Sequence, residues 1–305
     1  MRALVTGASG FLGRHLVAAL NARGDDVVAL VRDIDVDSFG SIYKYKPLRI
    51  ALGSFDQVER AIAEYEIDTV FHLAAQTQVS TAVADPIGTL EANVRGTWQV
   101  LEACRRQKVK RVIVASSDKA YGDGEVPYTE TQNLRHSGVY ATSKACADLI
   151  AQSYLQEYGM SIVITRCGNL YGPGHTNWST LIPGTIRSIL KGEAPRLRSN
   201  GQAKRDFLYV EDAVEGYLKL AESSRVGAFN FGGGQAWSAL EVVERICFMM
   251  QSGIKPIIEN NSPATEIDEQ WLSTDRASVL LGWHPTKPLD QGLEETIAWY
   301  REYLK

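Results

Sequence analysis

The stretch Ala3-Leu4-Val5-Thr6-Gly7-Ala8-Ser9-Gly10-Phe11-Leu12-Gly13 decides the fold of this 305-residue chain. Its apolar start predicts a strand, and a helical pattern follows the glycines. Gly7, Gly10 and Gly13 have the spacing G-x-x-G-x-x-G, a relative of the fingerprint that brings backbone close to a pyrophosphate at a helix N-terminus. A second apolar run at 27–31 completes a strand-turn-helix-strand unit. We therefore predict a dinucleotide site here; an ordinary strand-to-helix turn is the alternative.

The same alternation continues along the chain. Further strands are predicted at 69–73, 111–115 and 161–166. Helices are predicted between them, at 55–65, 89–107 and 137–158. Alternating strands and helices indicate an α/β protein with a Rossmann-type, doubly wound parallel sheet.

The regular alternation of strands and helices ends after Arg166, where glycine and proline cluster and the predicted elements become shorter. We expect residues 1–166 to form the dinucleotide-binding domain and residues 167–305 to form mainly a smaller, mixed α/β substrate lobe. Segments around 206–235 are expected to return to the first domain. The sequence shows no internal repeat.

Composition excludes several classes of function. The 32 Lys and Arg against 36 Asp and Glu give a net charge of −4, so nucleic acid is not an expected partner. No apolar run is long enough for a membrane span, and the first strand begins almost at Met1, so no membrane and a cytoplasmic location are expected. The four cysteines, Cys104, Cys146, Cys167 and Cys247, form no Cys-x-x-Cys motif, so no metal site is expected.

The choice of cofactor depends on the end of the second strand, Val31-Arg32-Asp33. An arginine at this place suits the extra phosphate of NADP, whereas an acidic residue binds the ribose hydroxyls of NAD. Arg32 comes first, which favours NADP. Asp33 leaves NAD open.

Tyr140 and Lys144 stand four residues apart, on one face of a predicted helix. A fixed cation beside a phenol stabilises the phenolate, so that Tyr140 could take a proton from an alcohol near neutral pH. The bare Tyr-x-x-x-Lys pattern also occurs by chance in surface helices. Ser117, at the end of a predicted strand, lies where sheets of this kind place their chemistry.

With these motifs, the chain resembles the extended short-chain dehydrogenase/reductase superfamily, and within it the nucleotide-sugar epimerases and dehydratases. The resemblance covers nearly the whole chain. The motifs that carry it are Thr6 to Gly13, Leu73-Ala74-Ala75-Gln76, Asn93-Val94-Arg95-Gly96-Thr97, Ser117 to Gly122, Tyr140 to Lys144, Asn169-Leu170-Tyr171-Gly172-Pro173, Arg205-Asp206-Phe207 and Leu281-Gly282-Trp283.

The resemblance implies a role for each matched residue. Tyr140 is the expected base, Lys144 its partner at the nicotinamide ribose, and Ser117 the hydrogen-bonding partner of the sugar hydroxyl. The residues expected to bind the cofactor are Gly7, Ser9, Gly10, Phe11, Leu12, Gly13, Arg32, Leu52, Leu73, Ala74, Ala75, Asn93, Tyr140 and Lys144. Those expected to bind the nucleotide-diphosphate sugar are Gln76, Ser117, Asn169, His175, Leu181, Ile182, Arg205 and Arg276.

Asp118 and Lys119 favour a 4,6-dehydratase over a 4-epimerase or a 4-keto reductase. A dehydratase must remove a proton from sugar carbon 5 and expel hydroxide from carbon 6, which requires an additional acid and base. The commonest dehydratases have Asp-Glu at these positions; Ser-Asp-Lys resembles the form in CDP-glucose 4,6-dehydratases, and Val31-Arg32 that in GDP-mannose dehydratases. We therefore expect a CDP- or GDP-hexose as substrate, with Asp118 as the acid and Lys119 as base or as electrostatic stabiliser.

Two further expectations come from the resemblance. The helices predicted at 89–107 and 137–158 are similar to those that pair in the superfamily's dimers, so a homodimer is expected. The bound cofactor is expected to be recycled in each turnover. A catalytically silent dinucleotide sensor is the alternative from another class, and the presence of Tyr140, Lys144 and Ser117 counts against it.

Overall fold

A seven-stranded sheet forms the centre of one part of the computed structural model, which describes residues 1–31, 45–50, 53–135, 138–261 and 267–305. All its strands are parallel. Their order across the sheet is β10 (Gly227–Phe231), β6 (Ile162–Cys167), β5 (Arg111–Ala115), β4 (Thr69–His72), β1 (Arg2–Thr6), β2 (Asp26–Val31) and β3 (Tyr45–Arg49). The predicted doubly wound sheet is confirmed.

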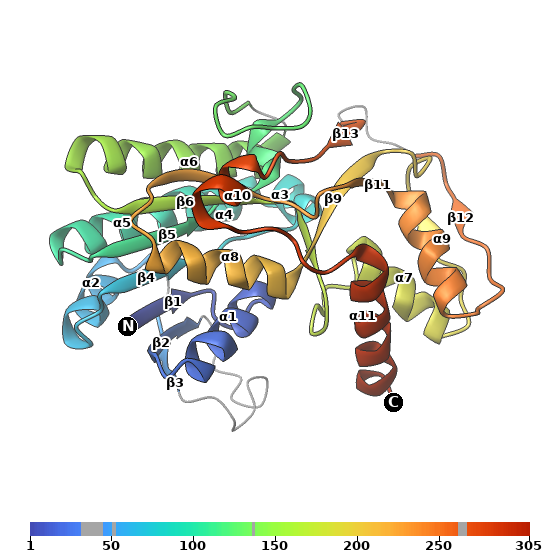
Figure 1. The fold of residues 1–305 in the computed structure, drawn as a ribbon, viewed down its shortest axis with the longest axis horizontal. Coiled ribbons are helices and arrows are strands. Elements are labelled where there is room, and N and C mark those ends of the chain that lie inside the picture. Colours follow the sequence, from blue (N-terminus) through green and yellow to red (C-terminus); the bar gives the residue numbers. More distant parts are fainter. Residues whose placement is uncertain (32–44, 51–52, 136–137, 262–266) are drawn as a thin grey trace.

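Helices cover both faces of this sheet, and the alternation of side chains along each strand explains why (Figure 1). In β1, Ala3 and Val5 face one core, which is shared with α1 (Phe11–Ala22) and α8 (Val210–Glu222). Leu4 faces the opposite core. That second core is completed by α2 (Phe55–Glu64), α5 (Gly96–Arg106) and α6 (Gly138–Tyr158).

The helix predicted at 89–107 is divided in the structure. It consists of α4 (Pro86–Leu90), the π-helical turn η2 (Glu91–Arg95) and α5. A short helix, α3 (Val79–Ala84), precedes it and was not predicted. A π-turn inserts one extra residue into a helix and rotates the side chains around it, which hydrophobic periodicity does not reveal.

The second lobe lies to the right of the main sheet in Figure 1 and has a core of its own. In one of its sheets β9 pairs with β11, β13 and β7, and in the other β12 pairs with β8. The strands are β7 (Asn169–Tyr171), β8 (Arg196–Leu197), β9 (Lys204–Tyr209), β11 (Ala236–Ser238), β12 (Ile257–Ile258) and β13 (Glu269–Gln270). The helices packed on its core are α7 (Leu181–Leu190), α9 (Ala239–Met249) and α11 (Leu289–Tyr303).

The chain crosses between the two parts more than once. After β9 in the second lobe, α8 packs on the main sheet and β10 forms its edge. α10 (Asp275–Leu281) then packs against β10. The division at residue 166 stays a prediction.

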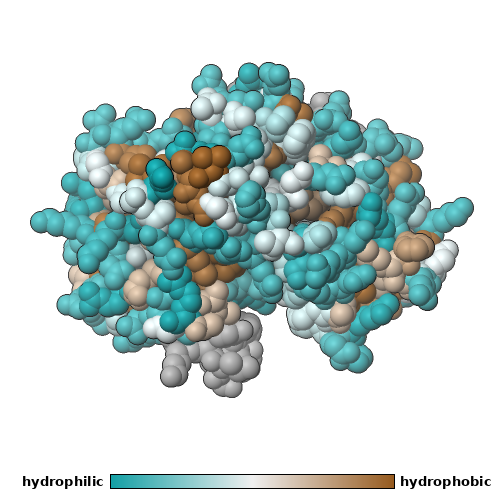
Figure 2. Space-filling view, in the orientation of Figure 1, coloured by the Kyte–Doolittle hydropathy of each residue, from teal (hydrophilic) through white to brown (hydrophobic). Residues whose placement is uncertain are grey.

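The surface in Figure 2 is mostly hydrophilic, with a brown apolar area near the place of α10 in Figure 1. α10 carries Val279, whose side chain is 80% exposed. In the described part of the chain, no helix combines the length and the apolar character needed to cross a membrane.

Candidate active site

The glycine-rich turn after β1 leaves room for a ligand at the start of α1. Gly7 has a φ of 67°, and a Cβ added there would lie 2.8 Å from the Cα of Ala74. A Cβ on Gly13 would lie 2.2 Å from the carbonyl oxygen of Gly7. α1 begins after Gly10, whose backbone is extended and which supplies no side-chain cap, so the first N–H groups of the helix stay open to a ligand. This cradle fits the pyrophosphate of a dinucleotide.

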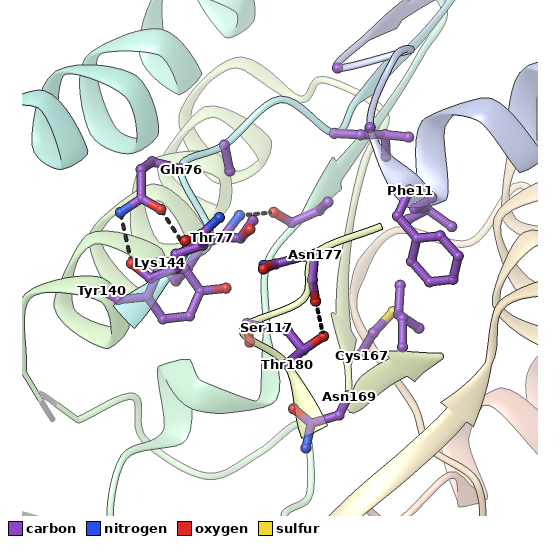
Figure 3. A pocket seen from close by; sticks show the side chains of 18 of the residues that line it. Phe11, Gln76, Thr77, Ser117, Tyr140, Lys144, Cys167, Asn169, Asn177 and Thr180 are labelled. Carbon is purple, nitrogen blue, oxygen red and sulfur yellow. Dashed lines mark hydrogen bonds between the residues drawn. The ribbon is translucent and has the colours of Figure 1, made fainter. Parts of the chain in front are cut away.

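A cavity of about 1340 Å³ runs from this turn to the second lobe. Figure 3 shows side chains from both parts, among them Phe11, Ser117, Tyr140 and Asn169, around the same space. The predicted site residues that line it are Gly7, Ser9, Gly10, Phe11, Leu12, Gly13, Leu73, Ala74, Ala75, Gln76, Ser117, Asp118, Lys119, Tyr140, Lys144, Asn169, His175, Leu181, Ile182 and Arg205.

Tyr140 and Lys144 both face the cavity from α6, but they do not show the electrostatics that the sequence predicted. Burial raises the pKa of Tyr140 to about 12, although a hydrogen bond with Ser117 acts in the opposite direction. The Lys144 ammonium donates a hydrogen bond of 2.8 Å to the carbonyl of Ala115, at the end of β5. Burial lowers the pKa of Lys144 to about 8. The phenol's pKa is therefore set by desolvation, and the lowering that was expected from Lys144 is not seen.

Asp118 and Lys119 form an ion pair directly after Ser117. The Lys119 Nζ lies 2.7 Å from Asp118 Oδ2, and the Ser117 hydroxyl donates to Asp118 Oδ1 at 3.0 Å. The Ser117 oxygen also caps the following 3₁₀ turn, η3 (Asp118–Tyr121), by accepting from the backbone N–H of Lys119. This cap fixes the three side chains relative to one another.

Asn93 lies behind the cavity wall rather than in it, and is 1% exposed. Its Oδ1 accepts from the backbone N–H of Gln76 at 2.7 Å, and its amide donates to the Gln76 carbonyl at 2.9 Å. The same amide donates to Ser143 Oγ at 2.8 Å, and Ser143 Oγ donates to the Tyr140 carbonyl at 2.7 Å. Asn93, predicted to contact the cofactor, instead joins the loop after β4 to the helix that carries Tyr140.

Arg276, predicted to bind the sugar nucleotide, does not line the cavity either. Arg276 is exposed on α10, where its guanidinium lies 4.7 Å from the ring centre of Phe229 and bonds the carbonyl of Val226. It is placed there because α10 packs on the sheet edge at β10 and not on the second lobe. Arg32 and Leu52 lie outside the described residues.

The structure brings further residues to the cavity that the sequence did not indicate. Ser116 lines the cavity with a buried hydroxyl that has no hydrogen-bond partner among the described residues, which suits a polar ligand atom. Arg198, beyond β8, brings a second arginine to the cavity besides Arg205. Thr180 lines it as well, and its hydroxyl donates to the Asn177 carbonyl (Figure 3). Ser116 could have been found from its place beside Ser117 at a strand end; Arg198 has no such signal.

Comparison with known proteins decides the family. Residues 3–232 match the model of the NAD dependent epimerase/dehydratase family. The chain belongs to this family. The epimerase/dehydratase assignment agrees with the parallel sheet, the glycine-rich turn and the Tyr140–Lys144 helix, and it makes the chain an enzyme of the NAD-dependent, nucleotide-sugar type.

Relatives within the epimerase/dehydratase family include both activities. The dTDP-glucose 4,6-dehydratase of Mycolicibacterium smegmatis is 32% identical over 315 residues, which cover 99% of this chain and 93% of the relative. The human dTDP-D-glucose 4,6-dehydratase is 29% identical, and the match covers 99% of this chain and 90% of the human protein. The structure of the Thermotoga maritima UDP-glucose 4-epimerase with UDP-glucose has a TM-score of 0.94 at 25% identity and covers all of both chains. The structure of the Streptomyces venezuelae dTDP-glucose 4,6-dehydratase, with NAD bound, has a TM-score of 0.90 at 26% identity. The match covers 99% of this chain and 97% of that one.

Proposed function

We propose that this protein is a nucleotide-sugar 4,6-dehydratase. It oxidises carbon 4 of the sugar, eliminates water across carbons 5 and 6, and returns the hydride to carbon 6, giving a 4-keto-6-deoxy sugar nucleotide. The observation that carries the proposal is the Asp118–Lys119 ion pair in the same cavity as Tyr140 and Ser117. An epimerase has no use for this additional pair, because it only returns the hydride to carbon 4.

Tyr140, Ser117 and Lys144 serve the oxidation of carbon 4. Ser117 orients the sugar hydroxyl, and Tyr140 takes its proton. The oxidised nicotinamide, when bound, supplies the hydride acceptor and a positive charge. Because the pKa of Tyr140 is raised to about 12 without that charge, we propose that Tyr140 ionises only in the loaded enzyme, where its phenolate accepts the proton of the sugar hydroxyl.

Asp118 and Lys119 serve the elimination. In the pair as found, Lys119 is the proton donor and Asp118 the acceptor. Transfer of that one proton to Asp118 gives a carboxylic acid for the departing hydroxide and an amine that can take the carbon 5 proton. If Lys119 keeps its proton, it stabilises the enolate by its charge, and the Asp118 carboxylate takes the carbon 5 proton and passes it to the departing hydroxide. Exchange of the carbon 5 hydrogen with deuterated water, measured in Lys119→Met and Asp118→Asn, separates these two roles of Lys119.

The substrate side of the cavity supports a diphosphate. Arg198 and Arg205 bring two guanidinium groups there, and a planar guanidinium suits paired phosphate oxygens. Asn169, at the start of β7, adds a neutral polar group. The expectation of a CDP- or GDP-hexose finds no support in the compared relatives, which are named for dTDP-glucose and UDP sugars. We therefore propose a nucleotide-diphosphate hexose with the base left open.

NAD is the proposed cofactor ahead of NADP. Epimerase/dehydratase structures with NAD bound resemble this chain closely, whereas the preference for NADP depended on Arg32, which the structure does not describe. Fluorescence titration with NADH and NADPH tests this choice, and tighter binding of NADPH would reverse it.

A 4-epimerase is the second candidate, because the Thermotoga maritima epimerase covers the whole chain at a TM-score of 0.94. Mass spectrometry of the product separates the two activities. A dehydratase product is lighter by one water, and an epimerised sugar nucleotide keeps its mass.

A homodimer is proposed from the helices beside the site. α3, α4 and α6 pack together and expose apolar side chains: Val83 is 71% exposed, Ile87 76% and Leu149 54%. A second copy that covers these side chains removes them from water.

A further inference from the structure

The loop at 172–178 links the second lobe to the cofactor turn through two aromatic residues of α1. The imidazole of His175 stacks on the ring of Phe11, with the ring centres 4.4 Å apart and the planes 10° from parallel. Phe11 is the first residue of α1 and lines the cavity. One turn further along α1, His15 Nε2 lies 2.8 Å from the carbonyl oxygen of Pro173. A carbonyl only accepts, so Nε2 of His15 carries the proton and donates.

A second anchor holds the same loop from the opposite lobe. The hydroxyl of Tyr300, on α11, donates a hydrogen bond to the backbone carbonyl of His175. Tyr300 is fully buried, and its ring lies 5.6 Å from that of Trp178. The loop is therefore fixed at one side to the helix that begins at the phosphate cradle, and at the other side to the last helix of the substrate lobe.

His175 also presents an unsatisfied polar atom at this place. Its Nδ1 is buried and has no hydrogen-bond partner among the described residues, while the residue lines the cavity together with Ser9 and Gly10. A buried polar atom without a partner is costly unless a ligand supplies one. Burial and the charge of Arg14 lower the pKa of His175 to about 4, so the ring is neutral at physiological pH.

We infer that His15 and Tyr300 are positioning residues that hold the loop 172–178 over the dinucleotide side of the cavity, and that this loop slows release of the dinucleotide. The inference rests on the proposed function in one respect. An enzyme that returns the same hydride to its own intermediate must keep the reduced cofactor until the second transfer. Neither His15 nor Tyr300 lines the cavity, so both act through the loop.

Release of NADH tests this inference. The protein is loaded with NADH, an excess of NAD⁺ is added, and the loss of bound-NADH fluorescence gives the dissociation rate. His15→Phe keeps an aromatic ring beside Phe11 and removes the donor to Pro173, and Tyr300→Phe removes only the hydroxyl. Each variant is expected to release NADH about three- to tenfold faster, the effect of one lost hydrogen bond. Tyr303→Phe, an exposed hydroxyl on the same helix, is the matched control and should release NADH at the wild-type rate.

A second readout separates positioning from a loss of fold. The variants should lose activity on dilution and regain it when NAD⁺ is added, with the KM for the sugar nucleotide unchanged. Release within twofold of wild type in both His15→Phe and Tyr300→Phe overturns the inference. Failure of the wild-type protein to bind NADH at all would instead contradict the proposed function.

Discussion

The side-chain amide of Asn93 donates a 2.8 Å hydrogen bond to the hydroxyl of Ser143, three residues along α6 from Tyr140. Asn93 also holds the backbone of Gln76, so one buried side chain joins the loop after β4 to the helix that carries Tyr140. Asn93→Ala removes three hydrogen bonds and leaves buried groups unpaired. We expect a loss of about 2 to 3 kcal/mol in the free energy of unfolding, measured by urea denaturation.

The same substitution should also affect catalysis. Because Tyr140 shifts relative to the sugar hydroxyl, kcat should fall by about a factor of 100. Ser143→Ala removes only one of the partners and should give an intermediate loss. Equal kcat in wild type and Asn93→Ala would show that the hydrogen bonds of Asn93 do not position Tyr140.

Lys144 is predicted to reduce the stability of the unliganded protein. Its pKa is lowered from 10.5 to about 8 in the fold, so at pH 7 the folded state holds a buried ammonium at a cost. After the lost hydrogen bond to Ala115 is subtracted, Lys144→Met should be more stable by about 2 kcal/mol at pH 7 and inactive. The cost is present in full below pH 8 and disappears as the pH rises from 8 towards 10.5, so the stability advantage of the variant should disappear over this range. A less stable variant at pH 7 would contradict this account of Lys144.

Asp118→Asn and Lys119→Met should separate the two half-reactions. Oxidation of carbon 4, seen as absorbance of the reduced nicotinamide, is expected to remain within about tenfold of wild type. Loss of water should fall by about a factor of 100 to 10,000, the usual contribution of an acid or base. Tyr140→Phe is the control, since it should stop both steps. Parallel loss of both steps in Asp118→Asn would argue against the assigned role of the pair.

Acid should destabilise the fold through His72, which is 2% exposed and whose two ring nitrogens are hydrogen-bonded to Thr6 and Thr97. Burial lowers its pKa from 6.5 to about 3. Between these values the unfolded chain binds a proton that the folded chain does not, so stability is lost as the pH falls below 6.5. The contribution is about 5 kcal/mol at most. Calorimetry should show that the stability of His72→Gln falls less steeply with decreasing pH than that of the wild type. Identical dependence of stability on pH in the two proteins would rule out His72 as the source of the acid sensitivity.

The proposed dimer is tested on the apolar helices. Ile87→Lys and Leu149→Glu place charges where a second copy would bury them, and each should shift the protein from dimer to monomer in sedimentation analysis. Phe248→Lys, at an 83% exposed position on α9, is the control and should not change the mass. A wild-type monomer at the same concentration would contradict the proposed dimer.

The sequence predicts the sheet well because its signals are local. Apolar runs, the turn at Gly7 to Gly13 and the Tyr140–Lys144 spacing each lie within one or two elements, and the strands carry them to one cavity. The role of Asn93 could not be predicted, since it depends on a π-turn that rotates this side chain towards α6. Arg276 was misplaced for a related reason: which lobe a short helix packs against is a long-range property.

The pKa values also depend on long-range packing that the local sequence does not predict. The sequence places an ammonium near a phenol, but the depth of both groups decides the outcome, and burial raises the pKa of Tyr140. The buried ion pair of Arg166 with Asp148, 2.8 Å long, is likewise invisible in the sequence. Asp148 lies one turn after Lys144 and raises the pKa of Lys144 against the effect of burial. Such networks form only when distant segments meet in the core.

The mass of the product tests the central claim most directly. The purified protein is incubated separately with dTDP-glucose, UDP-glucose, CDP-glucose and GDP-mannose in the presence of NAD⁺. The masses of the sugar nucleotides are then measured by mass spectrometry. We predict that one of them becomes lighter by one water and takes up one solvent deuterium at carbon 5 in deuterated water. Conversion of a substrate to an isomer of the same mass, with no loss of water from any of the four, would contradict the account and make the protein an epimerase.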